Sequence, residues 1–352
     1  MKIIEEELAI GWKQFTISND HGMTAKALNY GGIIKEINVP DKHGQVENVV
    51  LRYQNDEDYL KDPNFFGAVI GRIAGRIDRS SFSMNGENYE LEANDGEHHI
   101  HGGSEGFHTK VWETETFQEE DRAGLTLIHK SPHMDSGYPG ELTVKVTYQL
   151  NNNNQLLIDY QAESSHDTVL TLTNHTYFNL SGNLEHSILD HEVKIPSRQF
   201  LELDDHLIPT GTIRSVAGTP FDFRIPAPLR TGTQSSYDQN MIAKSGYDHY
   251  FLFDHIKKNT IEVRDEDSGR KLTIHTDQPG VVLYTSNNLT DEYQLAGRQS
   301  SKYSGVCFET QSSPASLHHE GLPSVKLKAG DRYTQQTSFI FITEGSADHG
   351  IS

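Results

Sequence analysis

The chain is poor in cysteine, in positive charge and in long apolar runs. Cys307 is the one cysteine among 352 residues, so a disulfide framework within the chain is excluded, and no Cys/His spacing resembles a structural zinc site. This favours a reducing compartment. The 30 Lys and Arg residues against 50 Asp and Glu give a formal net charge of −20, which argues against nucleic acid or an anionic membrane surface as the main partner. A neutral or cationic small ligand stays open.

Signals for export and for membrane insertion are also missing. No apolar run approaches the length that spans a bilayer, and the segment 1–8 has neither a basic leader nor an apolar stretch after it. We therefore expect a cytoplasmic protein. The 19 histidines include pairs at 98–99 and 318–319, but no carboxylate or cysteine partners stand at ligand spacing, so we expect no metal site.

Helical periodicity is nearly absent, and short apolar or alternating segments recur instead. They are typical of antiparallel strands and are separated by clusters of Gly, Asn, Asp and Pro. The clearest strand candidates are 33–39, 142–148, 155–160, 281–284 and 338–343. No alternation of strands with helices exists, which excludes a doubly wound nucleotide-binding sheet and a (β/α) barrel.

Turn residues between these segments predict hairpins. Asn85-Gly86 is the strongest signal, and 151–154 and 265–269 each join two strand candidates. A short helix over 56–61 is expected to stop before Pro63. The segment 197–247 has weak strand signals, and we interpret it as an excursion between strands rather than a linker between domains. The simplest architecture is all-β, with residues 1–352 in one large two-layered antiparallel β-sandwich.

The segment 171–180 is the most informative part of the chain. With the side-chain period of two, its polar residues share one face and most of its apolar residues the other. The polar row consists of Thr171, Thr173, His175, Tyr177 and Asn179. Such a row fits a surface that holds a polar ligand, and it fits equally well a solvated outer face with an incidental histidine.

Other segments offer side chains that could complete a ligand site. Gly75 and neighbouring glycines bracket Arg76 in a turn that lets the backbone approach a ligand, and His101 precedes a glycine pair. Asp248 stands at the entry to an aromatic strand, where capping of a turn is the simpler explanation. Glu309 shares a strand face with Cys307, and burial there would raise its pKa toward neutrality, although an exposed strand glutamate is the simpler reading of that segment alone.

Taken together, seven ordered segments resemble the aldose 1-epimerase (galactose mutarotase) family. They are Gly71-Arg-Ile-Ala-Gly-Arg-Ile77, Ile100-His-Gly-Gly103, Ser131-Pro132 with Gly137-Tyr-Pro-Gly140, Thr173-Asn-His-Thr-Tyr-Phe-Asn-Leu180, Gly246-Tyr-Asp-His249, Gln278-Pro-Gly-Val-Val-Leu-Tyr-Thr285 and Phe308-Glu-Thr-Gln311. The resemblance implies a galactose mutarotase-like supersandwich with an open sugar cleft. It also implies that His175 is the catalytic acid and Glu309 the catalytic base. The sugar-hydroxyl ligands that it implies are Arg76, His101, Asp248 and Tyr177.

The implied reaction interconverts α and β anomers of free aldohexoses such as galactose and glucose. It needs one positioned base and one positioned acid, without a metal or other cofactor. Acidic neighbours would raise the protonated fraction of His175. Where the family commonly has Asn and Gln this chain has Gly75 and Val282, which removes hydrogen bonds near the sugar and bears on substrate preference.

Two other functions compete with this one at the level of sequence. A glycoside hydrolase would use Glu309 and Asp248 as its carboxylate pair, and a non-catalytic module would only bind sugar. The implied partner is a small-molecule sugar, and the enzyme is expected to be a monomer or a homodimer.

Overall fold

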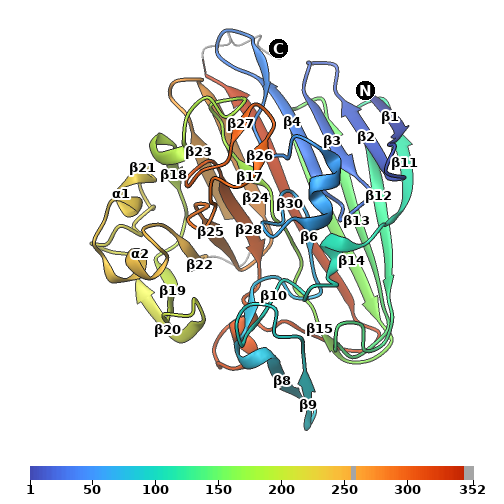
Figure 1. The fold of residues 1–352 in the computed structure, drawn as a ribbon, viewed down its shortest axis with the longest axis vertical. Helices are drawn as coiled ribbons and strands as arrows, with labels where there is room; N and C mark the ends of the chain where they lie inside the picture. Colours follow the sequence, from blue (N-terminus) through green and yellow to red (C-terminus); the bar gives the residue numbers. More distant parts are fainter. Residues whose placement is uncertain (255–258, 345–352) are drawn as a thin grey trace.

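Strands dominate the computed structural model, which describes residues 1–254 and 259–344 (Figure 1). The short helices are η1 (Asp56–Lys61), η2 (Asp78–Ser80), η3 (Phe107–Thr109), η4 (Ile188–Asp190), η5 (Pro314–Leu317), α1 (Arg230–Thr233) and α2 (Asp238–Ile242). The helix expected over 56–61 is confirmed as a 3-10 helix that ends before Pro63. Among the described residues no helix has the length and apolar character to cross a membrane.

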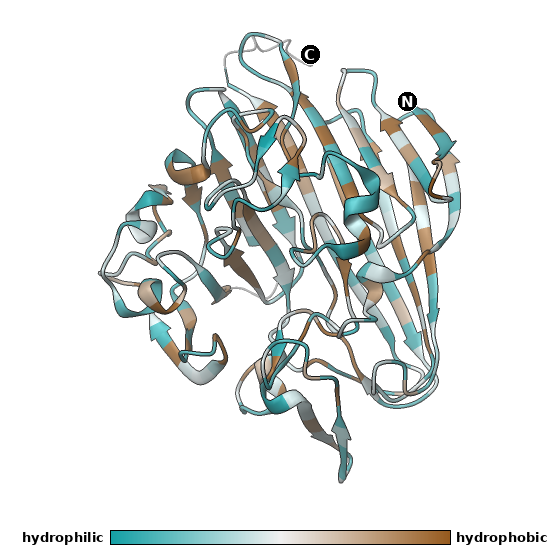
Figure 2. Cartoon of the chain, in the orientation of Figure 1, coloured by the Kyte–Doolittle hydropathy of each residue, from teal (hydrophilic) through white to brown (hydrophobic). Residues whose placement is uncertain are grey.

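A nine-stranded antiparallel sheet forms one layer of the molecule. In spatial order its strands are β11 (Glu113–Gln118), β12 (Arg122–Ser131), β13 (Leu142–Asn151), β14 (Gln155–Ser164), β30 (Arg332–Thr343), β24 (Arg270–Thr276), β23 (Asn259–Arg264), β18 (Glu192–Lys194) and β21 (Ala227–Pro228). Hydrophobic and hydrophilic residues alternate along its long strands (Figure 2), and buried residues recur at every second position of β13. This is the pattern of a sheet with one face on the core.

Two further sheets supply the second layer. The five-stranded sheet contains β1 (Lys2–Glu7), β2 (Lys13–Ser18), β3 (Thr24–Leu28), β4 (Ile34–Pro40) and β5 (Val46–Asn48). The six-stranded sheet contains, in spatial order, β17 (Tyr177–Phe178), β28 (Val306–Gln311), β25 (Gly280–Tyr284), β22 (Asp248–Leu252), β19 (Gln199–Leu203) and β20 (Pro209–Ser215). One continuous core joins all three sheets, with Ile37, Val146 and Val281 as representative members. The predicted all-β sandwich is therefore confirmed.

Short two-stranded pieces complete the fold and carry several loops of the site. They pair β6 (Val69–Ile70) with β16 (Thr173–Asn174), β7 (Arg76–Ile77) with β10 (His99–Ile100), β8 (Ser81–Met84) with β9 (Glu87–Glu90), β15 (Thr168–Val169) with β29 (Lys326–Leu327), and β26 (Gln294–Leu295) with β27 (Arg298–Gln299).

The predicted strands and hairpins are confirmed. All five strand candidates coincide with β4, β13, β14, β25 and β30, except that Ile33 precedes β4, and the structure extends most of them. Asn85 and Gly86 both have positive φ, at 54° and 83°, as the two-residue turn between β8 and β9 requires. Turns also join β13 to β14 and β23 to β24 at the expected places.

The segment 171–180 is not one strand, which corrects the prediction. It contains the ends of two small pairings, β16 and β17, with an irregular stretch at His175 between them. All its residues are buried, so the solvated outer face is wrong. The hydroxyls of Thr171 and Thr173 donate to the backbone oxygens of Ser312 and Thr310, each at 3.3 Å, because this segment packs along β28.

The segment 197–247 also contains more structure than its sequence suggests. It forms β19 and β20, the far edge of the six-stranded sheet, before α1 and α2. No linker between two cores interrupts it, and Phe200 and Phe221 belong to the main core.

Candidate active site

A cavity of about 340 Å³ opens over the six-stranded sheet. All six residues predicted for the site line it: Arg76, His101, His175, Tyr177, Asp248 and Glu309. The volume is within the usual range for small-molecule sites. Residues distant in sequence thus meet at one place, because strands and loops from five parts of the chain converge on this face of the sheet.

The register of the sheet builds the floor of the cavity. On β28, Glu309 lies opposite Val282 of β25, and Val282 lies opposite Tyr250 of β22. One step along the same face, Tyr284 pairs with both Cys307 and Asp248. The predicted alternation that places Cys307 and Glu309 on one face is therefore confirmed.

His175 and Glu309 form a buried pair at one end of the floor. The His175 Nε2 atom lies 3.5 Å from Oε1 of Glu309, and its Nδ1 atom lies 3.5 Å from Sγ of Cys307. The backbone of His175 is fixed as well, since its N–H donates to the Ala68 oxygen at 2.9 Å and its oxygen accepts from Gly67 at 3.0 Å. The imidazole is thus held between a carboxyl group and a thiol.

Burial sets the protonation of this pair. It lowers the pKa of His175 to about 4 and raises the pKa of Glu309 to about 8, the latter with help from the charge of Asp248 and against that of Arg76. The expectation that acidic neighbours would favour protonated His175 is therefore wrong, because burial has the larger effect. Near neutral pH the pair carries one proton, and burial favours the uncharged form with that proton on Glu309.

Arg76 is held between two carboxylates. Its Nε donates to Asp95 at 2.7 Å and its Nη1 to Asp248 at 3.3 Å. Burial raises the pKa of Asp248, while Arg76 opposes that rise. Asp95 also lines the cavity and was not predicted. The signal available was its place in an Asn-Asp-Gly turn just before the histidine-rich run.

His101 faces the cavity as a neutral donor. Its Nδ1 accepts a hydrogen bond from the Gly75 N–H at 3.1 Å, so the proton of the neutral ring sits on Nε2. Burial, together with the charges of His175 and Arg76, lowers the pKa of His101 well below its usual range. The ring can therefore donate one hydrogen bond to a ligand.

Phe65 is a wall residue that the sequence reasoning missed. Its ring centroid lies 4.8 Å from that of His101 and 5.9 Å from that of His175. Its backbone is left-handed, with φ 57°, a conformation that bulky residues rarely adopt. Next to it, the oxygen of Asn64 accepts the Tyr177 hydroxyl at 2.9 Å, so Tyr177 offers a ligand its ring and the remaining lone pairs of its oxygen.

Gly75 and Val282 both border the cavity. Gly75 has φ +90°, and a Cβ there would approach Cγ of Pro314 at 3.1 Å, so the turn requires glycine. Val282 leaves an apolar stretch of floor between Glu309 and Tyr250.

The nitrogen and oxygen atoms of His101, His175 and Glu309 lie within 4.8 Å of one another and are the one metal-like donor set found in residues 1–254 and 259–344. A four-coordinate zinc ion needs donors about 3.5 Å apart, given bonds of about 2.1 Å. The Gly75 hydrogen bond also keeps the proton on the His101 nitrogen that faces the other two groups. The arrangement suits hydrogen bonding better than metal ligation.

The fold and the site together define a class of protein. A β-sandwich whose cleft holds a buried histidine and glutamate in contact, beside an arginine held by carboxylates, fits an enzyme that moves protons on a polar small molecule. Comparison with known proteins supplies the family. The sequence model of the family described as aldose 1-epimerase matches residues 13–339.

Relatives and solved structures agree with that match. The galactose mutarotase of Sus scrofa is 36% identical over 332 residues, covering 94% of each chain, and the aldose 1-epimerase of Streptococcus thermophilus is 32% identical over 93% of each. The structure of galactose 1-epimerase from Lactobacillus acidophilus NCFM superimposes with a TM-score of 0.86 at 28% identity, covering 97% of this chain and 98% of that one. This chain belongs to the aldose 1-epimerase family.

The family is one of isomerases that interconvert the α and β anomers of aldoses. The resemblance found in the sequence is therefore confirmed, as is the galactose mutarotase-like sandwich. A glycoside hydrolase and a non-catalytic sugar-binding module are not favoured.

Proposed function

We propose that this chain interconverts the anomers of free aldohexoses such as galactose and glucose, with Glu309 as the base and His175 as the acid. The observation that carries the proposal is the buried pair itself, with 3.5 Å between Nε2 and Oε1 at the edge of a cavity of sugar-binding size. The relatives named galactose mutarotase support galactose as one substrate.

In the proposed reaction Glu309 takes the proton of the C1 hydroxyl while His175 gives a proton to the ring oxygen. The bond between C1 and the ring oxygen breaks, and an open-chain aldehyde forms. Rotation about the C1–C2 bond presents the other face of the aldehyde. The C5 hydroxyl then attacks C1, His175 recovers its proton, and Glu309 returns its own to the new C1 hydroxyl. The enzyme ends in the state in which it began.

One proton on His175 and Glu309 together is enough for the reaction in both directions, from α to β anomer and back. The uncharged form with the proton on Glu309 and the ion pair with the proton on His175 differ only by transfer across the 3.5 Å contact. Sugar hydroxyls in the cleft would help to solvate the ion pair, because polar groups stabilise charge that burial otherwise disfavours. The proposed reaction starts from that ion pair.

The remaining residues would hold the sugar. Arg76 and Asp248 can donate to and accept from hydroxyls at the far side of the ring, and His101 can donate through Nε2. Tyr177 would seat the ring beside His175, since their centroids are 4.9 Å apart. These roles are supported by the convergence of all four side chains on one cavity.

We also propose that residues 1–352 form a single domain that works in the cytoplasm as a monomer or homodimer. The core that contains both Phe15 and Phe341 supports one domain. The lone Cys307, which leaves no internal disulfide, supports a reducing compartment. A monomer would suffice, because every proposed site residue comes from one chain.

Substitution of the two catalytic groups tests the proposal. Glu309→Gln keeps the size of the side chain, and His175→Asn keeps a polar group that cannot act as an acid. Each should lower kcat about a hundred- to ten-thousand-fold, as expected for loss of general acid or base catalysis. The rate is followed by polarimetry on freshly dissolved α-D-galactose and α-D-glucose, with the uncatalysed rate subtracted.

Circular dichroism should show that both variants are folded. A folded variant that keeps the wild-type rate would refute the assigned role. Release of reducing sugar from a glycoside by the wild-type protein would instead favour the hydrolase.

A further inference from the structure

The thiol of Cys307 contacts the imidazole of His175 and has no part in the reaction proposed above. Its Sγ lies 3.5 Å from Nδ1 of His175, which is within hydrogen-bond reach because sulfur is larger than oxygen. Cys307 is fully buried and does not line the cavity, so a bound sugar does not touch it. Any effect of Cys307 on the reaction must therefore pass through His175.

The register of the sheet fixes this contact. On β28, Cys307 lies opposite Tyr177 of β17 on one side and Tyr284 of β25 on the other. His175 stands two residues before Tyr177, and its ring centroid lies 4.9 Å from that of Tyr177 and 6.2 Å from that of Tyr284. The two tyrosines limit the position of the imidazole, and the strand pairing keeps the sulfur at its Nδ1 edge.

The proposed reaction needs a proton on Nδ1 of His175 at every stage. The charged imidazole carries one proton on each nitrogen, and the Nε2 atom, 3.5 Å from Glu309, gives its proton away. The neutral ring that results keeps its proton on Nδ1. In the uncharged form of the pair Glu309 donates to Nε2, so the proton of the ring is again on Nδ1.

A buried Nδ1–H group needs an acceptor. Without one the N–H is left unsatisfied, which is costly, and the neutral ring can instead hold its proton on Nε2. That tautomer cannot accept a proton from Glu309, so it is inactive in the proposed reaction. The sulfur of a thiol has lone pairs that accept weakly, and Sγ of Cys307 is placed to do so.

The sulfur is also an uncharged partner. Burial, with the charges of Glu309 and Asp248, raises the pKa of Cys307 well above its usual range, so the group stays a thiol. A carboxylate in its place would stabilise the charged imidazole and raise its pKa. Beside the thiol, burial lowers the pKa of His175 to about 4, although a hydrogen bond to its own backbone acts against this. A strong acid suits proton transfer to the weakly basic ring oxygen of a sugar.

We propose that Cys307 is a positioning residue for the acid of this enzyme. Its sulfur accepts the Nδ1 proton of His175, and this selects the tautomer whose Nε2 atom exchanges a proton with Glu309 and with the sugar. This inference rests on the proposed function, because that function assigns the acid to His175.

A comparison of Cys307→Ala with Cys307→Ser tests the proposal. Alanine and serine are both smaller than cysteine and differ from each other by one hydroxyl, which can accept from Nδ1. Cys307→Ala should lower kcat for galactose about five- to twentyfold at about pH 6, and Cys307→Ser should stay within about threefold of wild type. KM should change less than about twofold in both, because neither substitution touches the residues proposed to hold the sugar.

The tautomer can be observed directly by nitrogen-15 NMR of ring-labelled histidine, with His175 assigned by its absence from the His175→Asn spectrum. The wild-type protein and Cys307→Ser should show the proton on Nδ1, and Cys307→Ala should show a shift toward Nε2. Val306→Ala is the matched control, since Val306 is the neighbouring residue on β28, lies in the main core and does not line the cavity. It should lower the stability of the protein and leave kcat unchanged.

Equal losses of kcat in Cys307→Ala and Cys307→Ser would overturn the proposal, because they would show that only the volume of the side chain matters. A wild-type rate or an unchanged tautomer in Cys307→Ala would overturn it too, as would an equal loss of kcat in Val306→Ala. Wild-type protein that leaves galactose at its spontaneous rate would overturn the proposed function itself.

Discussion

The proposed roles of His175 and Glu309 predict how the activity depends on pH. The proposed reaction needs one proton on the pair, so both groups protonated or both deprotonated is inactive. Because burial lowers the pKa of His175 to about 4 and raises that of Glu309 to about 8, kcat/KM should rise through the first value and fall through the second. Between them we expect a plateau.

The profile is measured by polarimetry in buffers of low catalytic power, with folding checked at each pH. The two limbs belong to the pair rather than to either residue. Glu309→Gln, which cannot lose a proton, should lose the alkaline limb from whatever activity remains. Wild-type activity that persists unchanged well above pH 8 would contradict the proposed protonation.

Arg76 should act through binding more than through chemistry. Arg76→Ala removes a charged donor from the cleft and leaves Asp248 without its 3.3 Å partner. Hydrogen bonds to charged groups contribute about 1.5 to 3 kcal/mol, so KM should rise roughly ten- to a hundred-fold with a smaller change in kcat. Steady-state kinetics over a range of galactose concentrations separate the two.

Arg122→Ala is a suitable control, because Arg122 forms an exposed ion pair with Glu119 on the nine-stranded sheet. An Arg76 variant with normal KM and lowered kcat would contradict the binding role and indicate that Arg76 takes part in catalysis.

At the scale of elements, the loop 62–66 positions the wall of the site. The Asp62 carboxylate accepts from the N–H groups of Asn64 at 2.7 Å and Phe66 at 2.6 Å, and from the Tyr53 hydroxyl at 2.7 Å. These bonds hold Phe65 in its left-handed conformation against His101 and His175. The loop thus links a carboxylate outside the cleft to the orientation of two imidazoles within it.

Asp62→Asn should disturb this arrangement, because an amide presents an N–H where a backbone N–H now donates. We expect a loss of about 1 to 3 kcal/mol in unfolding free energy and a fall in kcat of about tenfold or more, since small displacements of catalytic groups are costly. Thermal unfolding and kinetics report the two effects. Asp58→Asn, an exposed carboxylate in η1, is the control. Unchanged kcat in a destabilised Asp62 variant would limit the loop to a structural role.

The alternation of side chains along a strand holds in β28 but not in the segment 171–180. Alternation correctly predicts that Cys307 and Glu309 share one face, because β28 is a regular strand paired on both edges, with β17 and with β25. Alternation does not describe 171–180, because this segment pairs first with β6 and then with β28 and is irregular at His175 between the two pairings. Contacts with other strands, which a single segment does not encode, decided that geometry.

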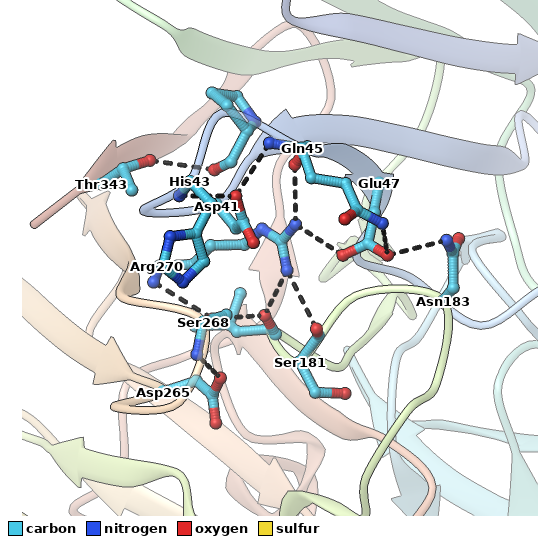
Figure 3. Close-up of polar contacts among 12 residues, drawn as sticks. Asp41, His43, Gln45, Glu47, Ser181, Asn183, Asp265, Ser268, Arg270 and Thr343 are labelled. Atoms are coloured by element: carbon cyan, nitrogen blue, oxygen red, sulfur yellow. Dashed lines mark hydrogen bonds and ion pairs between the residues drawn. The ribbon is translucent and has the colours of Figure 1, made fainter. Parts of the chain in front are cut away.

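At the scale of the whole molecule, Arg270 joins distant parts of the chain. Its guanidinium lies among the backbone oxygens of Leu180, Ser181 and Gln45 and the carboxylate of Glu47 (Figure 3). Arg270 is 1% exposed. It thereby ties β5 of the five-stranded sheet and the stretch after β17 to β24 of the nine-stranded sheet.

Arg270→Met should be strongly destabilising, because it leaves Glu47 and three oxygens without their buried donor. Breaking a buried ion pair in this way costs about 3 to 5 kcal/mol, which urea unfolding can measure. The folded fraction should keep its kcat, as Arg270 does not line the cavity. Arg264→Met removes a half-exposed ion pair between Arg264 of β23 and Glu344, which follows β30, and should cost less than about 1 kcal/mol. Equal losses of unfolding free energy in the Arg270 and Arg264 variants would contradict the role given to Arg270.

The sequence by itself determined the all-β class, the hairpins, the family and six of the residues that line the cavity. Strand periodicity and turn residues depend on neighbouring positions, so the sequence shows them directly. Motifs in a fixed order identify a family without coordinates. Tertiary structure alone decided what surrounds those residues, such as Asp95 on Arg76 and Phe65 over the two imidazoles. It also decided the protonation of His175 and Glu309, since burial depends on the whole fold and here outweighs the acidic composition of the chain.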